Sequence, residues 1–233
     1  MKKLFIVSLA LLTSLIAQAQ IVSSSSRSII VKPVERNTVF YLKGGLAFQT
    51  WTGKDAKSFG YNGKNPGSGV GYDVLFGFQK DFSFLNGLYW GPEIGIGSRG
   101  FRTSVSEDEA SESITAMMNA LKITPVQLGY KYNITNLLTI DAHIGFLMSV
   151  DLFGGMYYKY SYGKESDSSS KNLSELNELM NYKRFDIGIN PGITLWIGKL
   201  GVDFTYQKGF LSMAGDQGKL YAQNLLLRLA YRF

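Results

Sequence analysis

The feature that most constrains the fold is a strict alternation of apolar and polar residues. In segment 185–198 every odd-numbered residue is apolar, Pro191 included, whereas Trp196 is the only apolar residue at an even-numbered position. Successive side chains of a β-strand point to opposite faces. The pattern therefore predicts a strand with one apolar face and one polar face.

The same alternation recurs along the chain and predicts the remaining strands of an eight-stranded fold. These strands are expected at 38–49, 70–79, 88–100, 119–132, 138–151, 200–207 and 224–233. Segment 119–132 changes phase near Pro125, with Leu121 and Ile123 on the apolar face before it and Val126 and Leu128 after it. We predict a β-bulge there, because proline cannot donate a hydrogen bond to a neighbouring strand.

The connections between these strands alternate between short and long. The short ones are 83–87, 133–136 and 198–199, and the long ones are 50–69, 101–118, 152–183 and 208–218. An even number of strands with short turns on one side and long loops on the other is typical of outer-membrane barrels. We predict an all-β fold: an eight-stranded antiparallel up-and-down transmembrane β-barrel with short periplasmic turns and long extracellular loops.

The distribution of charge favours lipid outside the barrel over the alternative, a soluble lipocalin-like barrel with its apolar face around a ligand. Charged residues make up 18% of the chain and are almost absent from the apolar strand faces. A Lys or Arg facing the middle of a bilayer costs about 2–4 kcal/mol, which explains that absence. The apolar faces also end in aromatic residues such as Trp90, Tyr130 and Tyr231, as at membrane interfaces.

The N-terminus has the features of a secretory signal peptide. Two lysines precede an apolar run that ends in the Ala-x-Ala pattern of Ala17 and Ala19. We predict a cleaved signal peptide at 1–19, a periplasmic leader at 20–37 and the barrel domain at 38–233, in the bacterial outer membrane. The sequence pI of about 9.3 comes without a basic stripe, so no nucleic-acid partner is expected.

Four sequence motifs carry a family resemblance. They are AQAQ (17–20), FYLKGGLAFQTW (40–51), ITPVQLGYKYN (123–133) and LLLRLAYRF (225–233). The chain resembles the eight-stranded outer-membrane barrels described as PorT-like or porin-like. Its last strand, with Leu227, Leu229, Tyr231 and Phe233 at alternate positions, resembles the signal read by the barrel assembly machinery. The resemblance implies a fold and a location, because such barrels have many different roles.

The polar strand faces predict an ionic network in the barrel interior. An eight-stranded barrel is only wide enough to be filled by side chains, and buried charges must be paired. We therefore favour a plugged interior over a narrow gated pore. The predicted members are Lys43, Asp73, Glu93, Arg99, Lys131, Asp141, His143, Asp186, Asp203, Arg228 and Arg232.

His143 is the one residue that invites a catalytic hypothesis, because small barrels that modify lipid A use a His with a Ser and an acid. Ser149 lies on the same predicted face but about 20 Å further along the strand, which is too far for proton transfer. We predict a structural histidine and no enzyme. With one His and no Cys in the chain, no metal site and no cofactor are expected.

The second and third long loops are the predicted interaction surface. They carry Glu107, Asp108, Glu109, Glu112, Leu173, Leu176 and Leu179. Ser106 with Glu109 forms a capping-box pattern, and the leucines have helical spacing, so each loop is expected to form a short amphipathic helix.

These expectations favour a non-enzymatic outer-membrane barrel with a structural or interaction role through these two loops. The alternatives are a small porin or a secretion-associated, PorT-like barrel, and then a lipid A-modifying enzyme. The expected partners are outer-membrane lipid and lipopolysaccharide, the barrel assembly machinery during biogenesis, and a cell-envelope protein.

Overall fold

The computed structural model describes residues 38–60, 63–82, 86–107, 110–162, 165–215 and 218–233. The predicted signal peptide at 1–19 and leader at 20–37 lie outside these residues, as do Asp108 and Glu109. No helix of the described part is long and apolar enough to span a bilayer.

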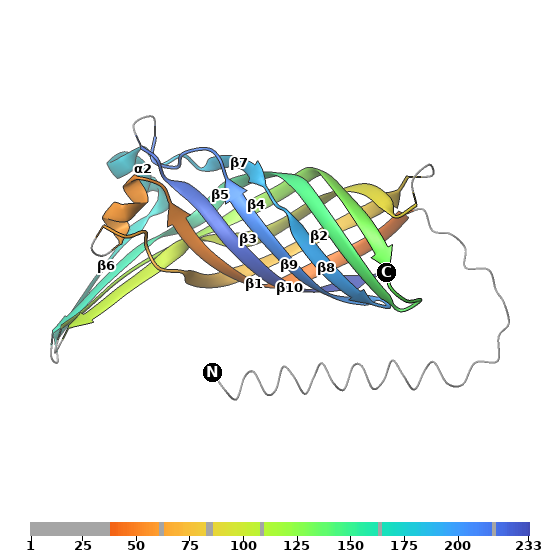
Figure 1. The fold of residues 1–233 in the computed structure, drawn as a ribbon. Coiled ribbons are helices and arrows are strands. Elements are labelled where there is room, and N and C mark those ends of the chain that lie inside the picture. Colours follow the sequence, from red (N-terminus) through yellow and green to blue (C-terminus); the bar gives the residue numbers. More distant parts are fainter. Residues whose placement is uncertain (1–37, 61–62, 83–85, 108–109, 163–164, 216–217) are drawn as a thin grey trace. The chain divides into compact units, whose positions relative to one another are not determined.

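The strands form a closed antiparallel ring, as predicted (Figure 1). In chain order they are β1 (Thr38–Thr52), β2 (Gly69–Asp81), β3 (Leu88–Glu107), β4 (Ala110–Asn133), β5 (Leu138–Tyr162), β6 (Glu165–Asn172), β7 (Phe185–Ile189), β8 (Gly192–Ile197), β9 (Leu200–Gly209) and β10 (Tyr221–Arg232). β1 pairs with β10 and closes the ring, and β6 pairs only with β5. Two short helices, η1 (Asp55–Phe59) and α2 (Leu173–Met180), lie in the long loops.

The strand predicted at 185–198 is interrupted in its middle. β7 and β8 both pair with β5 and β9, so they are two halves of one strand of the barrel wall. Asn190 and Pro191 separate them, and Pro191 has no backbone N–H to donate. The Asn190 N–H still donates to Gly145 O at 3.1 Å, and Pro191 O accepts from Tyr206 N at 2.9 Å. Counted as one strand, β7 and β8 give the ring its eight strands.

The bulge predicted at Pro125 is confirmed, because the register between β4 and β5 shifts between Ile123 and Val126. A second shift of this pair lies between Asn119 and Ala120. Near it, Gly154 has a φ of +143°, a conformation that side chains rarely allow. Inward-facing residues of β5 are therefore odd-numbered up to Asp151 and even-numbered from Met156.

The two faces of the ring differ as the alternation predicts. Apolar side chains on the outer face are largely exposed, for example Leu46 at 48% and Ile94 at 51%. Their inward-pointing neighbours on the same strands are buried and mostly polar or small, as Lys43 and Glu93 are. Removing apolar surface from water contributes a free energy of about 25 cal/mol per Å². A ring with this exposed apolar belt is therefore stable only where the belt is removed from water.

Two hairpins extend the sheet beyond the ring at the long-loop end. β3 pairs with β4 as far as Glu107 and Ala110, and β5 pairs with β6 as far as Tyr162 and Glu165. The outer parts of these strands, residues 101–107, 110–118, 155–162 and 165–172, form a four-stranded sheet that we call the extension (Figure 1).

The prediction of a helix in the second long loop is therefore wrong, because this loop forms the β3–β4 hairpin. Ser106, its predicted cap, lies in β3 opposite Ser111. The segment contains the β-branched residues Thr103, Ile114 and Thr115, which favour strands. Continuing a ladder already formed by the barrel satisfies each backbone group, whereas a short isolated helix is marginal in water.

The helix predicted in the third loop is confirmed as α2. Its N-terminus is capped by the Asn172 side chain, which accepts from the backbone N–H groups of Ser174 and Glu175 at 2.9 and 3.0 Å. The Glu175 carboxylate accepts in return from Asn172 N at 2.8 Å. This is a capping box, with asparagine in the place usually taken by serine or threonine.

An apolar cluster fills the long-loop end of the barrel, and we call it the cap. It joins inward-facing residues of the ring to loop residues that fold over them. Its buried members are Trp51, Ala56, Phe101, Ala116, Met118, Leu173, Leu176, Tyr182, Met213, Leu220 and Ala222. Trp51 and Phe101 pack edge to face with ring centroids 4.7 Å apart. The cap therefore closes the barrel on the side of the long loops.

Candidate functional site

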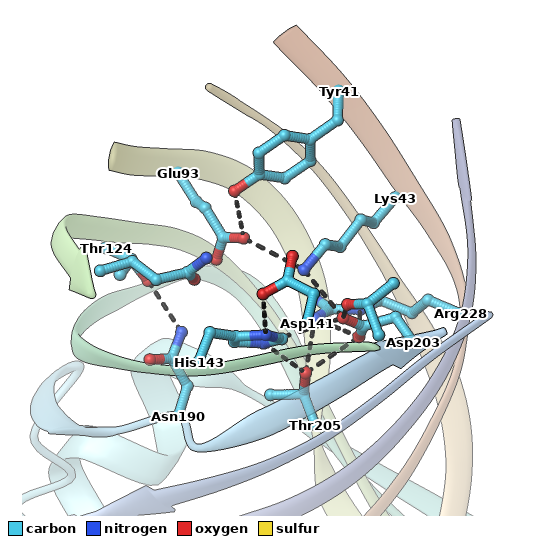
Figure 2. A network of polar contacts seen from close by, with 12 residues as sticks. Tyr41, Lys43, Glu93, Thr124, Asp141, His143, Asn190, Asp203, Thr205 and Arg228 are labelled. Carbon is cyan, nitrogen blue, oxygen red and sulfur yellow. Dashed lines mark hydrogen bonds and ion pairs between the residues drawn. The ribbon is translucent and has the colours of Figure 1, made fainter. Parts of the chain in front are cut away.

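The centre of the barrel interior holds a continuous chain of ion pairs. Asp203 binds Lys43 at 2.8 Å and Arg228 at 2.7 Å, and Arg228 also binds Asp73 at 2.6 Å. Lys122 binds the other oxygen of Asp73 at 2.6 Å. These residues come from five strands, β1, β2, β4, β9 and β10, so the pairs tie opposite walls together. Figure 2 shows Lys43, Asp203 and Arg228 of this chain.

Glu93 joins this chain at its edge. It accepts a hydrogen bond from the Tyr41 hydroxyl at 2.7 Å and lies 3.4 Å from Lys43 Nζ. The Gln127 amide nitrogen, in the orientation that satisfies its surroundings, donates to the Glu93 carboxylate at 3.0 Å. Glu93 thus has one cationic partner and two neutral donors, which together satisfy a buried carboxylate.

A second group of charges lies next to the cap. Arg99 makes a bidentate contact with Asp151, at 2.6 and 2.7 Å, and donates to Asp186 at 3.1 Å. Ser149 Oγ accepts from the same guanidinium at 3.0 Å. The Tyr182 hydroxyl donates to Asp151 at 2.6 Å, so this group anchors the cap to the charged interior.

A third group lies toward the short-turn end and is built mainly from neutral donors. Asp141 accepts from Gln79 Nε2 at 2.9 Å, Tyr89 Oη at 2.7 Å and Trp196 Nε1 at 3.2 Å. His143 Nδ1 lies 3.9 Å from Asp141 and has no hydrogen-bond partner. The Asp141 carboxylate is therefore stabilised mainly by hydrogen bonds from neutral groups.

The structure brings nine of the predicted network residues together in the interior and places the other two at the short-turn end. The buried ones are Lys43, Asp73, Glu93, Arg99, Asp141, His143, Asp186, Asp203 and Arg228. Lys131 pairs with the exposed Asp81 at 2.6 Å. The Arg232 guanidinium lies 5.1 Å from the Trp196 ring, and its Nε donates to Gly198 O at 2.7 Å.

Two buried charges of the network were missed by the sequence analysis. Lys122 lies between Leu121 and Ile123, so the alternation before the Pro125 bulge already assigns it to the inward face. Asp151 ends the inward face predicted for 138–151, which places it beside Arg99. Both signals were present in the sequence, but nothing there showed which charges would meet.

The interior is closed to water at the level of these ion pairs. Lys43, Asp203 and Arg228 are each at most 1% exposed, so a water-sized sphere does not reach them. Two cavities of about 10 Å³ lie among the interior side chains, each with room for about one water molecule. A water-filled pore would leave the side chains that line it exposed, and these are not.

The geometry around His143 does not form a hydrolytic site. Its Nε2 lies 3.4 Å from Thr205 Oγ1 and 3.8 Å from Asp203, while Ser149 binds Arg99 in the group next to the cap. The His143 side chain is 1% exposed and lies at the edge of an open hollow of about 660 Å³ that is lined mostly by apolar residues. Among the described residues, no group of three or more His, Cys, Asp or Glu side chains is placed to hold a metal ion.

The structure places the residues predicted in the interaction loops in different environments. Leu173 and Leu176 are 5% and 3% exposed and pack in the cap, where they hold α2 onto the barrel. They are therefore not available to a partner, which corrects the sequence-based expectation. Glu112 lies in β4 on the extension, opposite Tyr160. Glu107 ends β3, and Leu179 lies in the last turn of α2.

The extension carries exposed aromatic side chains that the sequence analysis did not assign to a site. Tyr158, Tyr160 and Tyr162 alternate along β5 and are 37%, 41% and 57% exposed. At the tip, Tyr160 and Tyr162 line an open cleft of about 490 Å³ together with Glu165, Ser166 and Asp167. The spacing of the tyrosines at every second position was the signal that could have revealed this face.

The ring and its faces define the class of protein. In lipid, every backbone polar group must be bonded within the protein, which a closed ring of strands achieves without an edge. The exposed apolar belt, the charged interior and the alternation of short turns with long loops are those of an outer-membrane β-barrel. The chain is therefore an outer-membrane barrel protein.

Comparisons with known proteins give likenesses of fold. Neither a protein-family model nor a curated protein matches the chain. The crystal structure of Neisserial surface protein A (NspA) aligns with 83% of this chain and 97% of its own, at 9% identity and a TM-score of 0.39. The attachment invasion locus protein Ail of Yersinia pestis aligns with 84% of this chain and 98% of its own, at 13% identity and a TM-score of 0.37.

The N-terminal β-barrel domain of Pseudomonas aeruginosa OprF is similar over 84% of this chain and 98% of its own, at 8% identity and a TM-score of 0.32. At TM-scores this low, the class assignment rests on the closed ring and the apolar belt of the chain itself.

Proposed function

We propose that the protein is a non-enzymatic outer-membrane barrel that acts as a structural or interaction protein through the hairpins of its second and third long loops. The observation that carries this proposal is the extension, because it raises a four-stranded sheet beyond the ring. The barrel beneath it is filled by ion pairs and closed by the cap. A rigid base that presents an ordered sheet to the outside suits recognition better than transport.

The proposal assigns three kinds of partner to three surfaces. Outer-membrane lipid and lipopolysaccharide cover the apolar belt. The barrel assembly machinery binds the last strand during biogenesis, where Leu227, Leu229, Tyr231 and Phe233 all face outward and are 38–68% exposed. A cell-envelope protein binds the extension. No nucleic acid and no cofactor take part.

The first test is the orientation of the hairpins. The chain has no cysteine, so single-cysteine variants report on one position each. We expect a membrane-impermeant maleimide to label Ser168→Cys in β6 on intact cells and to leave Thr135→Cys in the short turn after β4 unlabelled until the outer membrane is opened. Labelling of Thr135→Cys alone on intact cells would contradict the proposal.

A small porin is the alternative function, and a measurement of ion conductance tests it. The buried ion pairs favour a closed interior, so the refolded protein should add no steady conductance to a planar bilayer. Steady channel activity of the refolded wild-type protein would favour a pore in place of the interaction role. A lipid A-modifying enzyme would change the lipid A mass spectrum of cells that express the protein, and we expect no such change.

A secretion-associated, PorT-like role is the second candidate, and the strand motifs FYLKGGLAFQTW and ITPVQLGYKYN favour it. It predicts stable co-purification with other components of a secretion apparatus after mild detergent extraction. It also predicts that deleting the chain abolishes export of surface proteins, which a purely structural barrel would leave intact.

A further inference from the structure

One face of the extension is built around tyrosine rings. Alternate residues of a strand share a face, so Tyr158, Tyr160 and Tyr162 lie on one side of β5. Met156 precedes them on the same side and packs against the cap. Tyr157 and Lys159 lie on the other side. The rings are spaced about 7 Å apart along the strand, given about 3.3–3.4 Å per residue.

Carboxylates flank these rings on the neighbouring strands. Tyr160 lies opposite Glu112 of β4 on one side and Asp167 of β6 on the other. Tyr162 lies opposite Glu165. Residues directly opposite each other in an antiparallel pair have Cβ atoms about 4.5–5.5 Å apart, so each carboxylate is next to a ring. We call Tyr158, Tyr160, Tyr162, Glu112, Glu165 and Asp167 the tyrosine face.

The carboxylates of the tyrosine face have no cationic partner among the described residues. None of the ion pairs between these residues involves Glu112, Glu165 or Asp167. Lys171 lies on the same side but opposite Met156, four residues from Asp167 and thus about 13 Å along the strand. Partial burial and the negative charge of Glu112 raise the pKa of the Tyr158 hydroxyl.

The charge of the two hairpins has the opposite sign to that of the chain. Segments 101–118 and 157–172 together contain six acidic and four basic residues, whereas the whole chain has a formal net charge of +6. A negative potential on the outermost part of the protein attracts cations and steers them to this end.

Elsewhere in the chain, a lysine contacts both a tyrosine ring and a carboxylate. Lys43 lies 5.2 Å from the Tyr41 ring and also binds carboxylates, and Lys131 lies 5.0 Å from the Tyr89 ring and binds Asp81. On the tyrosine face, the rings and carboxylates are present, and no residue of the described part supplies the cation. The face is therefore complementary to a basic group that brings its own positive charge.

We propose that the tyrosine face binds an arginine- or lysine-rich segment of a partner protein. Each basic side chain would lie against a tyrosine ring and pair with a carboxylate of an adjacent strand. The periodic rings along β5 suit a peptide in extended conformation, and the cleft of about 490 Å³ at the tip has room for its side chains. The inference rests on the proposed function, because the face is reached only from outside the cell.

Arginine should bind better than lysine. Its guanidinium group is planar, stacks on aromatic rings and donates two parallel hydrogen bonds to a carboxylate. The binding site also has hydroxyl groups and aromatic rings that could hold a sugar, and the experiment separates the two by charge.

The experiment uses the full mature chain in nanodiscs of phosphatidylcholine, which carry no net charge. Fluorescence polarisation measures the binding of labelled nona-arginine, nona-lysine and nona-glutamate peptides. We expect nona-arginine to bind most tightly, nona-lysine more weakly and nona-glutamate not at all, with affinity falling as salt rises. Equal affinity for the three peptides would overturn the proposal, as would preferential binding of a neutral oligosaccharide.

Variants locate the binding on the correct face. Tyr160→Ala combined with Tyr162→Ala removes two rings and should weaken nona-arginine binding about fourfold to twenty-fivefold, at about twofold to fivefold for each exposed ring. Tyr157→Ala is the matched control, because it removes a tyrosine from the other face of the same strand. An equal loss in this control would place the binding elsewhere and overturn the proposal.

A conservative variant separates the ring from its hydroxyl. Tyr160→Phe with Tyr162→Phe keeps both rings and should retain binding within about twofold, whereas a loss as large as that of the alanine variant would show recognition of the hydroxyls and not of a cation. If Ser168→Cys is labelled on intact cells but no basic peptide binds, this inference fails and the proposed function stands. If Ser168→Cys is not labelled, both fail.

Discussion

The barrel interior and the tyrosine face both contain carboxylates and tyrosine rings. The carboxylates of the interior are buried and most are paired with cations, whereas those of the tyrosine face are at least partly exposed to water. In the interior, Asp203 meets Lys43 and Arg228 and is inaccessible to water. On the tyrosine face, Asp167 is exposed, and its carboxylate accepts from the neighbouring Ser168 N–H at 2.8 Å. Pairing follows from burial, because an unpaired charge in the interior would cost several kcal/mol, about the whole stability of a domain, whereas water solvates an exposed one.

This difference separates residues that hold the fold from residues that are free to act. A group whose hydrogen-bonding capacity is used inside the chain has little to offer a ligand. The exposed carboxylates and rings of the extension cost little to maintain and contribute little to stability. Substitutions in the two regions should therefore differ in both size and kind of effect.

The largest effect is expected for Arg228→Met in the interior. It leaves Asp203 and Asp73 buried with one cationic partner fewer each, and breaking a buried pair in this way costs about 3–5 kcal/mol. Urea unfolding of the barrel in detergent micelles, followed by the heat-modifiable shift on gels, measures the loss. A change below about 1 kcal/mol would show that water reaches these carboxylates.

An intermediate effect is expected for Tyr182→Phe, which links the charged interior to the cap. It removes one hydrogen bond to a carboxylate, worth about 1.5–3 kcal/mol. Burial raises the pKa of Tyr182 well above its usual value, which the negative charge of Asp151 reinforces and Arg99 opposes.

The raised pKa gives this residue a pH dependence with a definite sign. The folded state keeps the Tyr182 proton above pH 10, where the unfolded chain loses it, so its contribution to stability is complete below about pH 10 and falls as the pH rises beyond. The wild type should therefore lose more stability than Tyr182→Phe between pH 9 and pH 11. Parallel unfolding curves of the two proteins over this range would contradict the assignment.

The smallest effect on stability is expected for Glu112→Gln with Asp167→Asn on the tyrosine face. Exposed substitutions of this kind change the free energy of unfolding by no more than about 0.5 kcal/mol. The same pair should weaken nona-arginine binding and flatten its dependence on salt. A large loss of stability would mean that these carboxylates support the fold, and the contrast between the two regions would not hold.

Much of the barrel could be predicted because period-two alternation is a local property. Leu121 and Val126 have opposite parity, and this change of phase, together with the proline between them, located the bulge at Pro125. The helix predicted around Ser106 was wrong because its capping pattern is also local, and an extended ladder with β4 competes with it. In the third loop no strand of the ring continues through 173–180, and the predicted helix forms there.

The candidate sites were less predictable than the strands. Alternation showed that Arg99 and Asp151 face inward, but their contact depends on how strands β3 and β5 curve around the ring. The same is true of Leu176, whose helical spacing marks an apolar face without showing whether a partner or the barrel covers it. The structure shows that the cap covers Leu176, and the cap is built from loops that are distant in sequence.

The sequence by itself determined the eight strands of the ring, their two faces and the alternation of turns, because side-chain direction in a strand depends only on the parity of the residue. The tertiary structure alone decided which charges meet, that the cap closes the interior, and that Tyr160 lies between Glu112 and Asp167. These relations join residues tens of positions apart. They depend on ring closure and register, which no local pattern encodes.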